Sequence, residues 1–249
     1  MTAADRLIVA FDAPDLRAAV RLARELRGLV RYAKIGSILF TAAGPVAIER
    51  FLALGFKVFL DLKFHDIPST VEQSCRAAVR HQVSMLTVHA TGQPQMLEAA
   101  AAGARHEAQR LGVRRPKILG VTVLTSVPDG ASQRVAARRM SLTRRVVELA
   151  LQARRAGLDG VVASAHEAPA IRRKVGRSLA IVCPGIRPGT AGTSDQRRIA
   201  TPREAIANGA DFLVVGRPIT EAREPRAIVK RLLAEITEGM KRCSREITC

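Results

Sequence analysis

The segment DLKFHDIPST, residues 61–70, carries two carboxylates and an ammonium group out of an apolar run. The preceding letters VFL are typical of a buried strand. Removing one ion from water costs several kcal/mol, so charges at the end of a core strand have to pair with each other. We expect Asp61, Lys63 and Asp66 to offset one another in this way.

An ion-pair network that merely closes the end of a strand would have a similar composition. Because strand side chains alternate, Asp61 and Lys63 are predicted to point to one side of the strand and Leu62 to the other. Pro68 fits the first turn of a helix, and polar residues follow it near the N-terminus of that helix. A strand, a charged cluster and a helix start in this order favour a catalytic site.

Polar residues also stand near the ends of other predicted strands. They are Asp12, Lys34, His89, Thr125 and Arg217. Separate strand ends meet at one pocket only if the sheet closes into a barrel. There Lys34, Asp61, Lys63 and Asp66 would alternate in sign, and their mutual fields would keep the lysines protonated and the aspartates ionised.

Such a set of charges could hold an anion and deliver a proton. A carboxylate placed against a substrate anion either raises the energy of the bound ground state or forms part of a field matched to the transition state. The adjacent Lys63 could then protonate the carbon that is left behind.

The last two predicted strands are followed by glycine-containing segments that suit a phosphate group. These are CPGIRPGTAGTSDQ, residues 183–196, and the pair Gly216 and Arg217. Backbone N–H groups there can donate to an oxyanion, and an arginine adds a planar fork of donors. The loops after strands seven and eight of a barrel are a common place for phosphate binding.

The sequence predicts no metal site. His65 and His89 lack a partner at H-x-H or H-x-x-x-H spacing, and we expect them to be structural hydrogen-bonding residues. The four cysteines are scattered without a C-x-x-C pair, which argues against both a disulfide framework and a zinc site. They are expected to be reduced.

Apolar runs and helical spacing alternate along the chain. Strands are predicted at residues 6–12, 32–37, 57–63, 85–90, 118–125, 160–165, 179–185 and 212–217. Helices are predicted at residues 16–26, 45–54, 68–81, 95–110, 142–156, 166–175, 202–208 and 225–240. This order predicts the α/β class and a single (β/α)₈ TIM barrel over residues 1–240, followed by a basic C-terminal tail at 241–249. Two long connections, 126–140 and 186–201, are candidates for mobile lids on the catalytic face.

The composition sets broad limits on the class of protein. Of the 249 residues, 47% are hydrophobic but only 3% are aromatic, so the core is expected to be aliphatic. No apolar run approaches the roughly 20 residues needed to span a bilayer, and the N-terminus becomes acidic too soon for a secretory signal. We therefore expect a cytoplasmic protein without a membrane partner.

The formal net charge of +18 requires that a nucleic-acid partner be considered. The arginine pairs are spread over the polar sides of predicted helices, however, which favours solvated helix faces. With one tyrosine and no tryptophan, the chain also lacks the usual stacking platform for single strands. These observations argue against nucleic-acid binding. A basic nucleic-acid-binding protein on a barrel scaffold stays the alternative from another class, and the basic tail leaves a second anionic partner open.

Taken together, several segments resemble the orotidine 5'-phosphate decarboxylase family. They are VAFD ending at Asp12, AKIG with Lys34, DLKFHDIPST, LTS at 124–126, PGIRP at 184–188 and VVGRPIT at 214–220. The resemblance runs from Leu7 to about Thr220. It implies decarboxylation of orotidine 5'-monophosphate to uridine 5'-monophosphate and CO₂, the last step of de novo UMP synthesis, with no metal or organic cofactor.

The resemblance also implies roles for individual residues. Lys63 would donate the proton to C6 of the pyrimidine, and Asp61 would lie against the departing carboxylate. Lys34 and Asp12 would hold the ribose hydroxyls and order the charge network. The remaining substrate contacts would be Thr125 to the pyrimidine ring and, to the phosphate, Arg187, Gln196, Gly216 and Arg217.

The family resemblance further implies a homodimer with shared sites, in which Asp66 and Thr70 reach into the partner's site. The nearest rival enzyme is a sugar-phosphate decarboxylase or aldolase of the same suprafamily. It would share Asp61, Lys63 and Asp66 but typically requires Mg²⁺, and the letters HDIPST after the shared D-x-K argue against it.

Overall fold

The computed structural model describes residues 1–125, 141–189 and 198–246, with side chains described as far as residue 242. Eight parallel strands follow one another around a closed barrel, in which β1 pairs with both β2 and β8. The strands are β1 (Leu7–Ala10), β2 (Tyr32–Gly36), β3 (Lys57–Phe64), β4 (Met85–His89), β5 (Lys117–Val121), β6 (Gly160–Val162), β7 (Ala180–Cys183) and β8 (Phe212–Val215).

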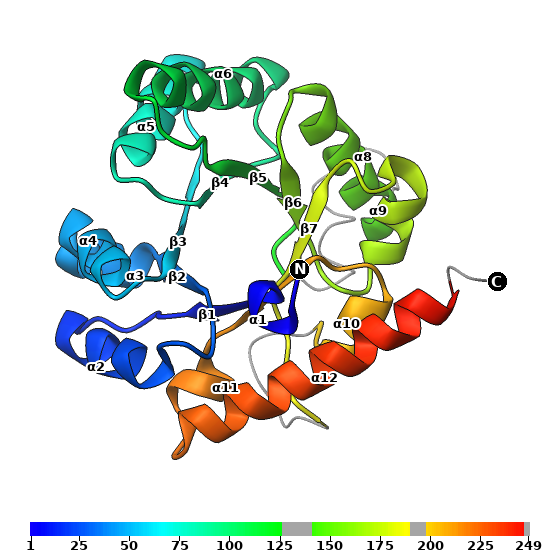
Figure 1. Ribbon diagram of the computed structural model, residues 1–249. Helices are drawn as coiled ribbons and strands as arrows, with labels where there is room; N and C mark the ends of the chain where they lie inside the picture. The colour runs from blue at the N-terminus through cyan, green and yellow to red at the C-terminus, as the bar shows by residue number, and fades with distance from the viewer. Residues whose placement is uncertain (126–140, 190–197, 247–249) are drawn as a thin grey trace.

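Helices surround this ring of strands, as Figure 1 shows. Those that match predicted helices are α2 (Leu16–Leu26), α4 (Pro45–Ala53), α5 (Pro68–Arg80), α6 (Pro94–Leu111), α8 (Leu142–Arg155), α9 (Ala168–Val175), α10 (Pro202–Ala207) and α12 (Pro225–Glu246). Within the described ranges, three short helices were not predicted: α1 (Ala3–Arg6), α3 (Ser37–Ala43) and α11 (Arg217–Thr220). The (β/α)₈ TIM barrel predicted from the sequence is confirmed.

Several predicted strands are too long at their carboxyl ends. Ladder bonding continues for one residue past β1 and β5, where Phe11 N donates to Lys34 O and Thr122 N to Val162 O, and the chain then leaves the sheet. Asp12 and Thr125 therefore lie in loops rather than at strand termini, and Arg217 opens α11. Helix α12 runs through the expected boundary at residue 240 to Glu246, so residues 241–246 continue a helix. The division into a barrel and a tail otherwise stays a prediction.

Most helix starts follow from local chemistry. Asp15 caps α2 by accepting from the N–H groups of Arg17 and Ala18. Thr201 and Glu204 form a reciprocal capping box at α10. Pro68 stands in the first turn of α5, as predicted, and this places the helix directly after the charged end of β3.

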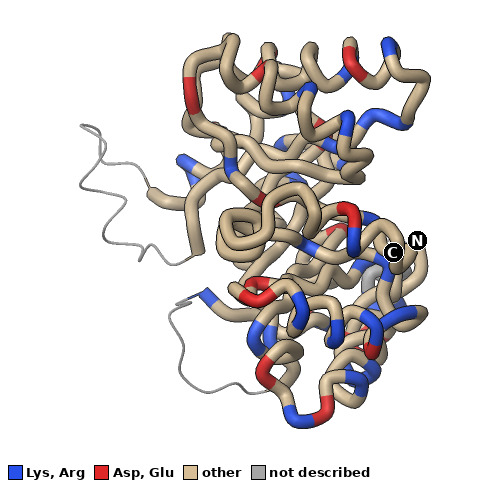
Figure 2. The backbone as a smooth tube through the Cα atoms, turned by 90° about the vertical axis from the view of Figure 1, so that its left-hand side faces the viewer, with Lys and Arg blue, Asp and Glu red and all other residues tan. Residues whose placement is uncertain are grey.

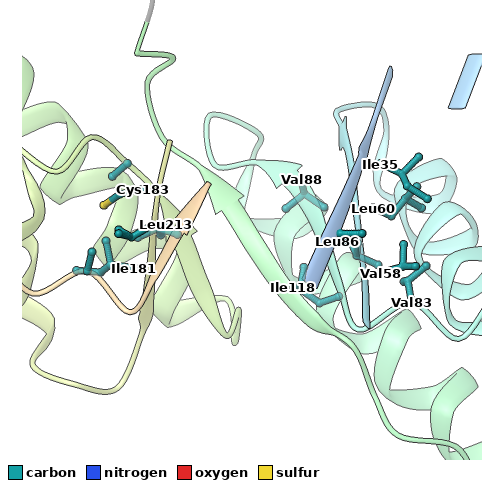
Figure 3. Close-up of a cluster of buried hydrophobic side chains, with 14 of the residues drawn as sticks. Ile35, Val58, Leu60, Val83, Leu86, Val88, Ile118, Ile181, Cys183 and Leu213 are labelled. Atoms are coloured by element: carbon teal, nitrogen blue, oxygen red, sulfur yellow. The ribbon is translucent and has the colours of Figure 1, made fainter. Parts of the chain in front are cut away.

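The core has two layers. Inside the barrel a small cluster is formed by Ile8, Ala10, Phe59, Met85, Leu119, Val182, Phe212 and Val214. A larger, mostly aliphatic cluster lies between the strands and the helices, and Figure 3 shows part of it with Leu60, Leu86 and Ile118. Phe11, Phe51 and Phe56 lie in this larger cluster, where the rings of Phe11 and Phe51 pack edge to face with their centroids 4.7 Å apart. The strands are thus buried on both faces, as in other parallel barrels.

Lys and Arg are dispersed over many elements rather than gathered in one run (Figure 2). Part of the arginine excess has a structural use. Glu107 of α6 is fully buried, and its carboxylate accepts from Arg76 at 3.1 Å, from Arg80 at 2.7 Å and from Arg110 at 2.7 Å. Hydrogen bonds from these guanidinium groups hold the pKa of Glu107 well below its usual range.

In the part of the chain that the structure describes, no helix is both long and apolar enough to cross a membrane.

Candidate active site

A cavity of about 590 Å³ opens at the carboxyl ends of the strands. Its wall brings together eight of the predicted site residues. They are Asp12, Lys34, Asp61, Lys63, Thr125, Arg187, Gly216 and Arg217. The convergence of residues from separate strand ends is the arrangement that the closed barrel was expected to produce.

Four of these residues form one chain of alternating charges. Lys34 Nζ lies 2.8 Å from Asp12 Oδ1 and 3.4 Å from Asp61 Oδ2. Lys63 Nζ lies 3.0 Å from the same Asp61 oxygen. The side chains of Lys34 and Asp61 are 9% and 12% exposed, whereas that of Lys63 is 32% exposed. Lys63 is thus the ammonium group of the two with more access to the cavity.

Lys63 adopts a backbone conformation that is rare for any residue except glycine. Its φ is 54°, in the left-handed region, and the register between β3 and β4 shifts between Leu60 and Phe64. A conformation of this kind costs of order 1–3 kcal/mol and persists only where the surroundings impose it. Here the irregularity sets the Lys63 side chain beside Asp61, while Leu62 packs with the outer core.

Thr87 of β4 is the residue that holds this irregular segment. Its hydroxyl accepts from the backbone N–H of Lys63 at 2.9 Å and donates to Asp61 Oδ1 at 3.0 Å. Thr87 is fully buried, so it has no access to substrate and acts through its two partners. Sequence reasoning missed it, although a threonine within the apolar run MLTVH was a usable signal, because a buried hydroxyl needs a partner.

Gly36 leaves room for the other end of the charge chain. A Cβ atom at this position would lie 2.6 Å from Asp12 Oδ1 and 2.8 Å from Lys34 Nζ. Both distances are shorter than real Cβ contacts, so any other residue would displace the ion pair. The glycine of the AKIG segment is therefore part of the site.

The electrostatic environment keeps Asp61 ionised. Burial alone would raise the pKa of its carboxyl group, but the charges of Lys34 and Lys63, with hydrogen bonds from Lys63 and Thr87, lower it by more. The net effect is a pKa below the ordinary value of 3.8. Asp61 thus carries a full negative charge at neutral pH next to the cavity.

His65 and His89 lie together beside this network, with their ring centroids 5.4 Å apart. Burial, followed by the influence of His65 and Lys63, lowers the pKa of His89. Among the described residues, no group of three or more His, Cys, Asp and Glu side chains is placed to hold a metal ion. The absence of a metal stays a prediction.

The structure does not bring Asp66 into the ion-pair network of its own chain. Asp66 lies past the end of β3, is exposed, and its Oδ1 accepts from the backbone N–H of Ile67 at 2.7 Å. Thr70, on the first turn of α5, is also exposed, and neither residue lines the cavity. The expectation that Asp66 offsets Asp61 and Lys63 within one chain is therefore wrong, because the chain turns toward α5 before Asp66 can reach them.

Part of the predicted phosphate-binding site lies outside the described residues. Arg187, Gly216 and Arg217 line the cavity at the ends of β7 and β8, whereas Gln196 lies outside the described residues, as do the connection 126–140 and the middle of the connection 186–201. The two described ends of the connection 186–201 are hydrogen-bonded to each other. Arg187 N donates to Ala200 O, and Ala200 N donates to Gly185 O.

A buried ion pair joins three loops on this face. Arg198 pairs with Glu167, which follows β6, and Arg198 Nη2 donates to Leu124 O in the loop after β5 at 3.2 Å. Both charged side chains are less than 10% exposed. Sequence reasoning missed this pair, because nothing in the spacing of residues 167 and 198 indicates that they meet. The pair sets the loop that carries Thr125 relative to the loop that carries Arg187.

Comparison with known proteins gives a consistent result. The model of the "Orotidine 5'-phosphate decarboxylase / HUMPS family" matches residues 5–232. The orotidine 5'-phosphate decarboxylase of Moorella thermoacetica is 48% identical over 236 residues, which cover 95% of this chain and 94% of that protein. The one of Nitrosococcus oceani is 44% identical over 232 residues, covering 93% and 97%.

Solved structures agree with the sequence relatives. The crystal structure of orotidine 5'-phosphate decarboxylase from Lactobacillus acidophilus superposes with a TM-score of 0.81 at 35% identity, covering 93% of this chain and 99% of that one. A crystal structure of an uncharacterized conserved protein from Geobacillus kaustophilus superposes with a TM-score of 0.80 at 34% identity, covering 92% and 99%.

The lowered pKa of Asp61 leads to a prediction about stability in acid. The folded chain binds the Asp61 proton less readily than the unfolded chain, so the resulting stabilisation is present above the ordinary pKa and is lost as the pH falls through the folded value. We expect the free energy of unfolding of the wild type to fall more steeply than that of Asp61→Asn between about pH 6 and about pH 3. Urea titrations at each pH measure the free energy of unfolding of both proteins.

The matched control is Glu98→Gln, which removes an exposed carboxylate of α6. Its acid dependence should follow the wild type. Parallel curves for wild type and Asp61→Asn would contradict the prediction.

Proposed function

The chain belongs to the orotidine 5'-phosphate decarboxylase family, and from this premise we propose which of its residues act in the reaction. The reaction is decarboxylation of orotidine 5'-monophosphate to uridine 5'-monophosphate and CO₂ in pyrimidine biosynthesis. The observation that carries the assignment of roles is the chain of charges from Asp12 through Lys34 and Asp61 to Lys63, at the mouth of the barrel.

The positions of the lining residues suggest the orientation of the substrate. Arg187, Gly216 and Arg217 receive the phosphate at the ends of β7 and β8, with Gln196 as a further contact. Asp12 and Lys34 hold the ribose hydroxyls. Thr125 hydrogen-bonds the pyrimidine ring and helps to direct its C6 carboxylate toward Asp61 and Lys63. What supports this arrangement is that the described members of the set line one cavity.

The bond between C6 and the carboxylate breaks, CO₂ leaves, and the electron pair stays on C6. Asp61, ionised beside the cavity, repels the substrate carboxylate but not neutral CO₂, so its field favours departure. Lys63, at 3.0 Å from Asp61, donates a proton from its ammonium group to C6. Solvent then reprotonates the amine. In this proposal no metal or organic cofactor takes part.

Thr87 is proposed as a positioning residue for this step. The orientation of Lys63 depends on a left-handed backbone conformation, and the hydroxyl of Thr87 is a hydrogen-bond partner of both that backbone and Asp61. Losing the hydroxyl would leave a buried N–H without an acceptor and a carboxylate oxygen without a donor. Lys63 would then spend less time in the geometry that protonates C6.

We further propose that the chain is a homodimer in which Asp66 and Thr70 complete the partner's site. Both residues are exposed, and Ile67 between them is 63% exposed, the highest value among the large apolar side chains of the described residues. In a two-fold symmetric pair each chain would both give and receive these residues. A cytoplasmic location and a single catalytic barrel over residues 1–240 belong to the same proposal.

For Lys63→Ala we expect turnover of orotidine 5'-monophosphate to fall by at least about 1,000-fold, because C6 loses its proton donor. Binding of uridine 5'-monophosphate should change much less, since the phosphate contacts remain. The loss of orotate-ring absorbance measures turnover, and a metal chelator should leave the wild type unaffected. Lys57→Ala, at the opposite end of the same strand, is the control and should retain turnover. Near-normal turnover in Lys63→Ala would refute the proton-donor role.

For Thr87→Val, which keeps the shape but removes the hydroxyl, we expect kcat to fall about 10- to 100-fold, because a hydrogen bond to a charged group is lost. KM should change less than about threefold. Thr87→Ser restores the hydroxyl and should recover most of kcat. If Thr87→Val only lowered the thermal unfolding temperature and kept the wild-type kcat, the residue would be structural alone.

Sharing of sites can be tested by mixing two inactive variants. In a heterodimer of Lys63→Ala and Asp66→Asn chains, one site would combine an intact Lys63 with an intact Asp66 from the partner. Random mixing should therefore restore activity to about a quarter of the wild-type value. Differently tagged chains allow the heterodimer to be purified. If purified heterodimer showed no recovery, Asp66 would not act across the interface.

A further inference from the structure

A second cavity, of about 520 Å³, lies at the other end of the barrel. The first residues of β2, β3, β4 and β5 contribute to its wall: Tyr32, Lys57, Met85 and Lys117. The segment between α6 and β5 adds Val113, Arg114 and Arg115, and Asp159 precedes β6. Because the active site lies at the carboxyl ends of the strands, the two cavities face opposite ends of the barrel. We call this second one the basal cavity.

The basal cavity has an excess of positive charge. Four cationic side chains line it, namely Lys57, Arg114, Arg115 and Lys117, against the single carboxylate of Asp159. That carboxylate is already used, since Asp159 pairs with Arg115 and its Oδ2 accepts from Ile118 N at 2.9 Å. Within the described residues no ion pair joins the other three cations to an acidic side chain. Three positive charges thus face one concave surface.

Arg115 is the least available of the four cations to a ligand. The Nη1 atom of Arg115 is out of contact with solvent and has no hydrogen-bond partner among the described residues. That atom is closed off from the cavity, so Arg115 serves here as the ion-pair partner of Asp159 rather than as a donor to a ligand.

The wall is less suited to a nucleobase than to phosphate. The ring of Tyr32, the one tyrosine in the sequence, packs edge-on against Phe212 with the centroids 5.7 Å apart. Lys57 Nζ lies over that ring, 5.6 Å from its centroid. Stacking is thus restricted, whereas a segment with several cations, here Arg114 to Lys117, that lies opposite a lysine of another strand, Lys57, suits phosphate recognition.

We propose that the basal cavity binds a diphosphate or triphosphate group. Three cations without a carboxylate partner, Lys57, Arg114 and Lys117, match an anion with several charges and several acceptor oxygens better than a single phosphate. The volume lies within the range of small-molecule sites. This site is independent of the catalytic roles proposed above, and it gives a use to part of the excess positive charge.

Isothermal titration calorimetry on the full chain tests the proposal. Saturating uridine 5'-monophosphate first fills the active site, and inorganic tripolyphosphate is then titrated at physiological ionic strength. We expect one site per chain, with affinity reduced about tenfold in Arg114→Gln and in Lys117→Gln, because each removes a charged contact. Arg154→Gln, an exposed arginine of α8, is the matched control and should bind like the wild type.

Further titrations show which kind of molecule supplies the phosphate chain. Uridine triphosphate that binds no more tightly than tripolyphosphate would mean that the phosphate chain alone is recognised, and tighter binding would mean a nucleotide site. All variants should retain orotidine 5'-monophosphate turnover, which checks that they are folded. The proposal is overturned if tripolyphosphate does not bind, if uridine 5'-monophosphate abolishes its binding, or if both cavity variants bind like Arg154→Gln.

Discussion

The ion-pair chain from Asp12 through Lys34 and Asp61 to Lys63 is the constraint on which the active site depends. Four charges held within a few ångströms of each other at the end of a buried sheet are stable only as a set. Gly36 leaves space for one end of the chain, and Thr87 fixes the other by bonding both Asp61 and the backbone of Lys63. The strained conformation of Lys63 is thus supported by a fully buried neighbour, which makes the site rigid before substrate arrives.

The barrel separates this rigid part from the loops that are proposed to contact the rest of the substrate. Charged groups from β2 and β3 are anchored in the sheet, whereas Thr125 and Arg187 stand on loops. The buried pair of Arg198 and Glu167 ties those loops to each other across the ends of β5, β6 and β7. The position of a loop residue can then be fixed nearly as firmly as that of a strand residue. The reason is that its segment is held by a buried ion pair and by a hydrogen bond to a backbone carbonyl.

The cationic residues that give the chain its high positive charge serve several separate purposes. Some of it lines the active-site cavity, three arginines neutralise the buried carboxylate of Glu107, and another set lines the basal cavity. The remaining Lys and Arg residues are spread over many elements (Figure 2). Sequence composition alone could not separate these uses, because a net charge says nothing about which side chains face one another.

Alternation of apolar runs and helical spacing was enough to predict the eight strands, the order of the barrel and the face that carries the site. The D-x-K spacing predicted that Asp61 and Lys63 lie close together, but in the structure their contact depends on the left-handed conformation of Lys63 and the register shift after Leu60, which strand alternation does not predict. Only the tertiary structure decided that Asp66 leaves the network of its own chain, that Thr87 supports Lys63, and that Arg198 meets Glu167. These contacts depend on where a chain turns after a strand and on which distant segments then become neighbours. Periodicity along the sequence carries no information on either.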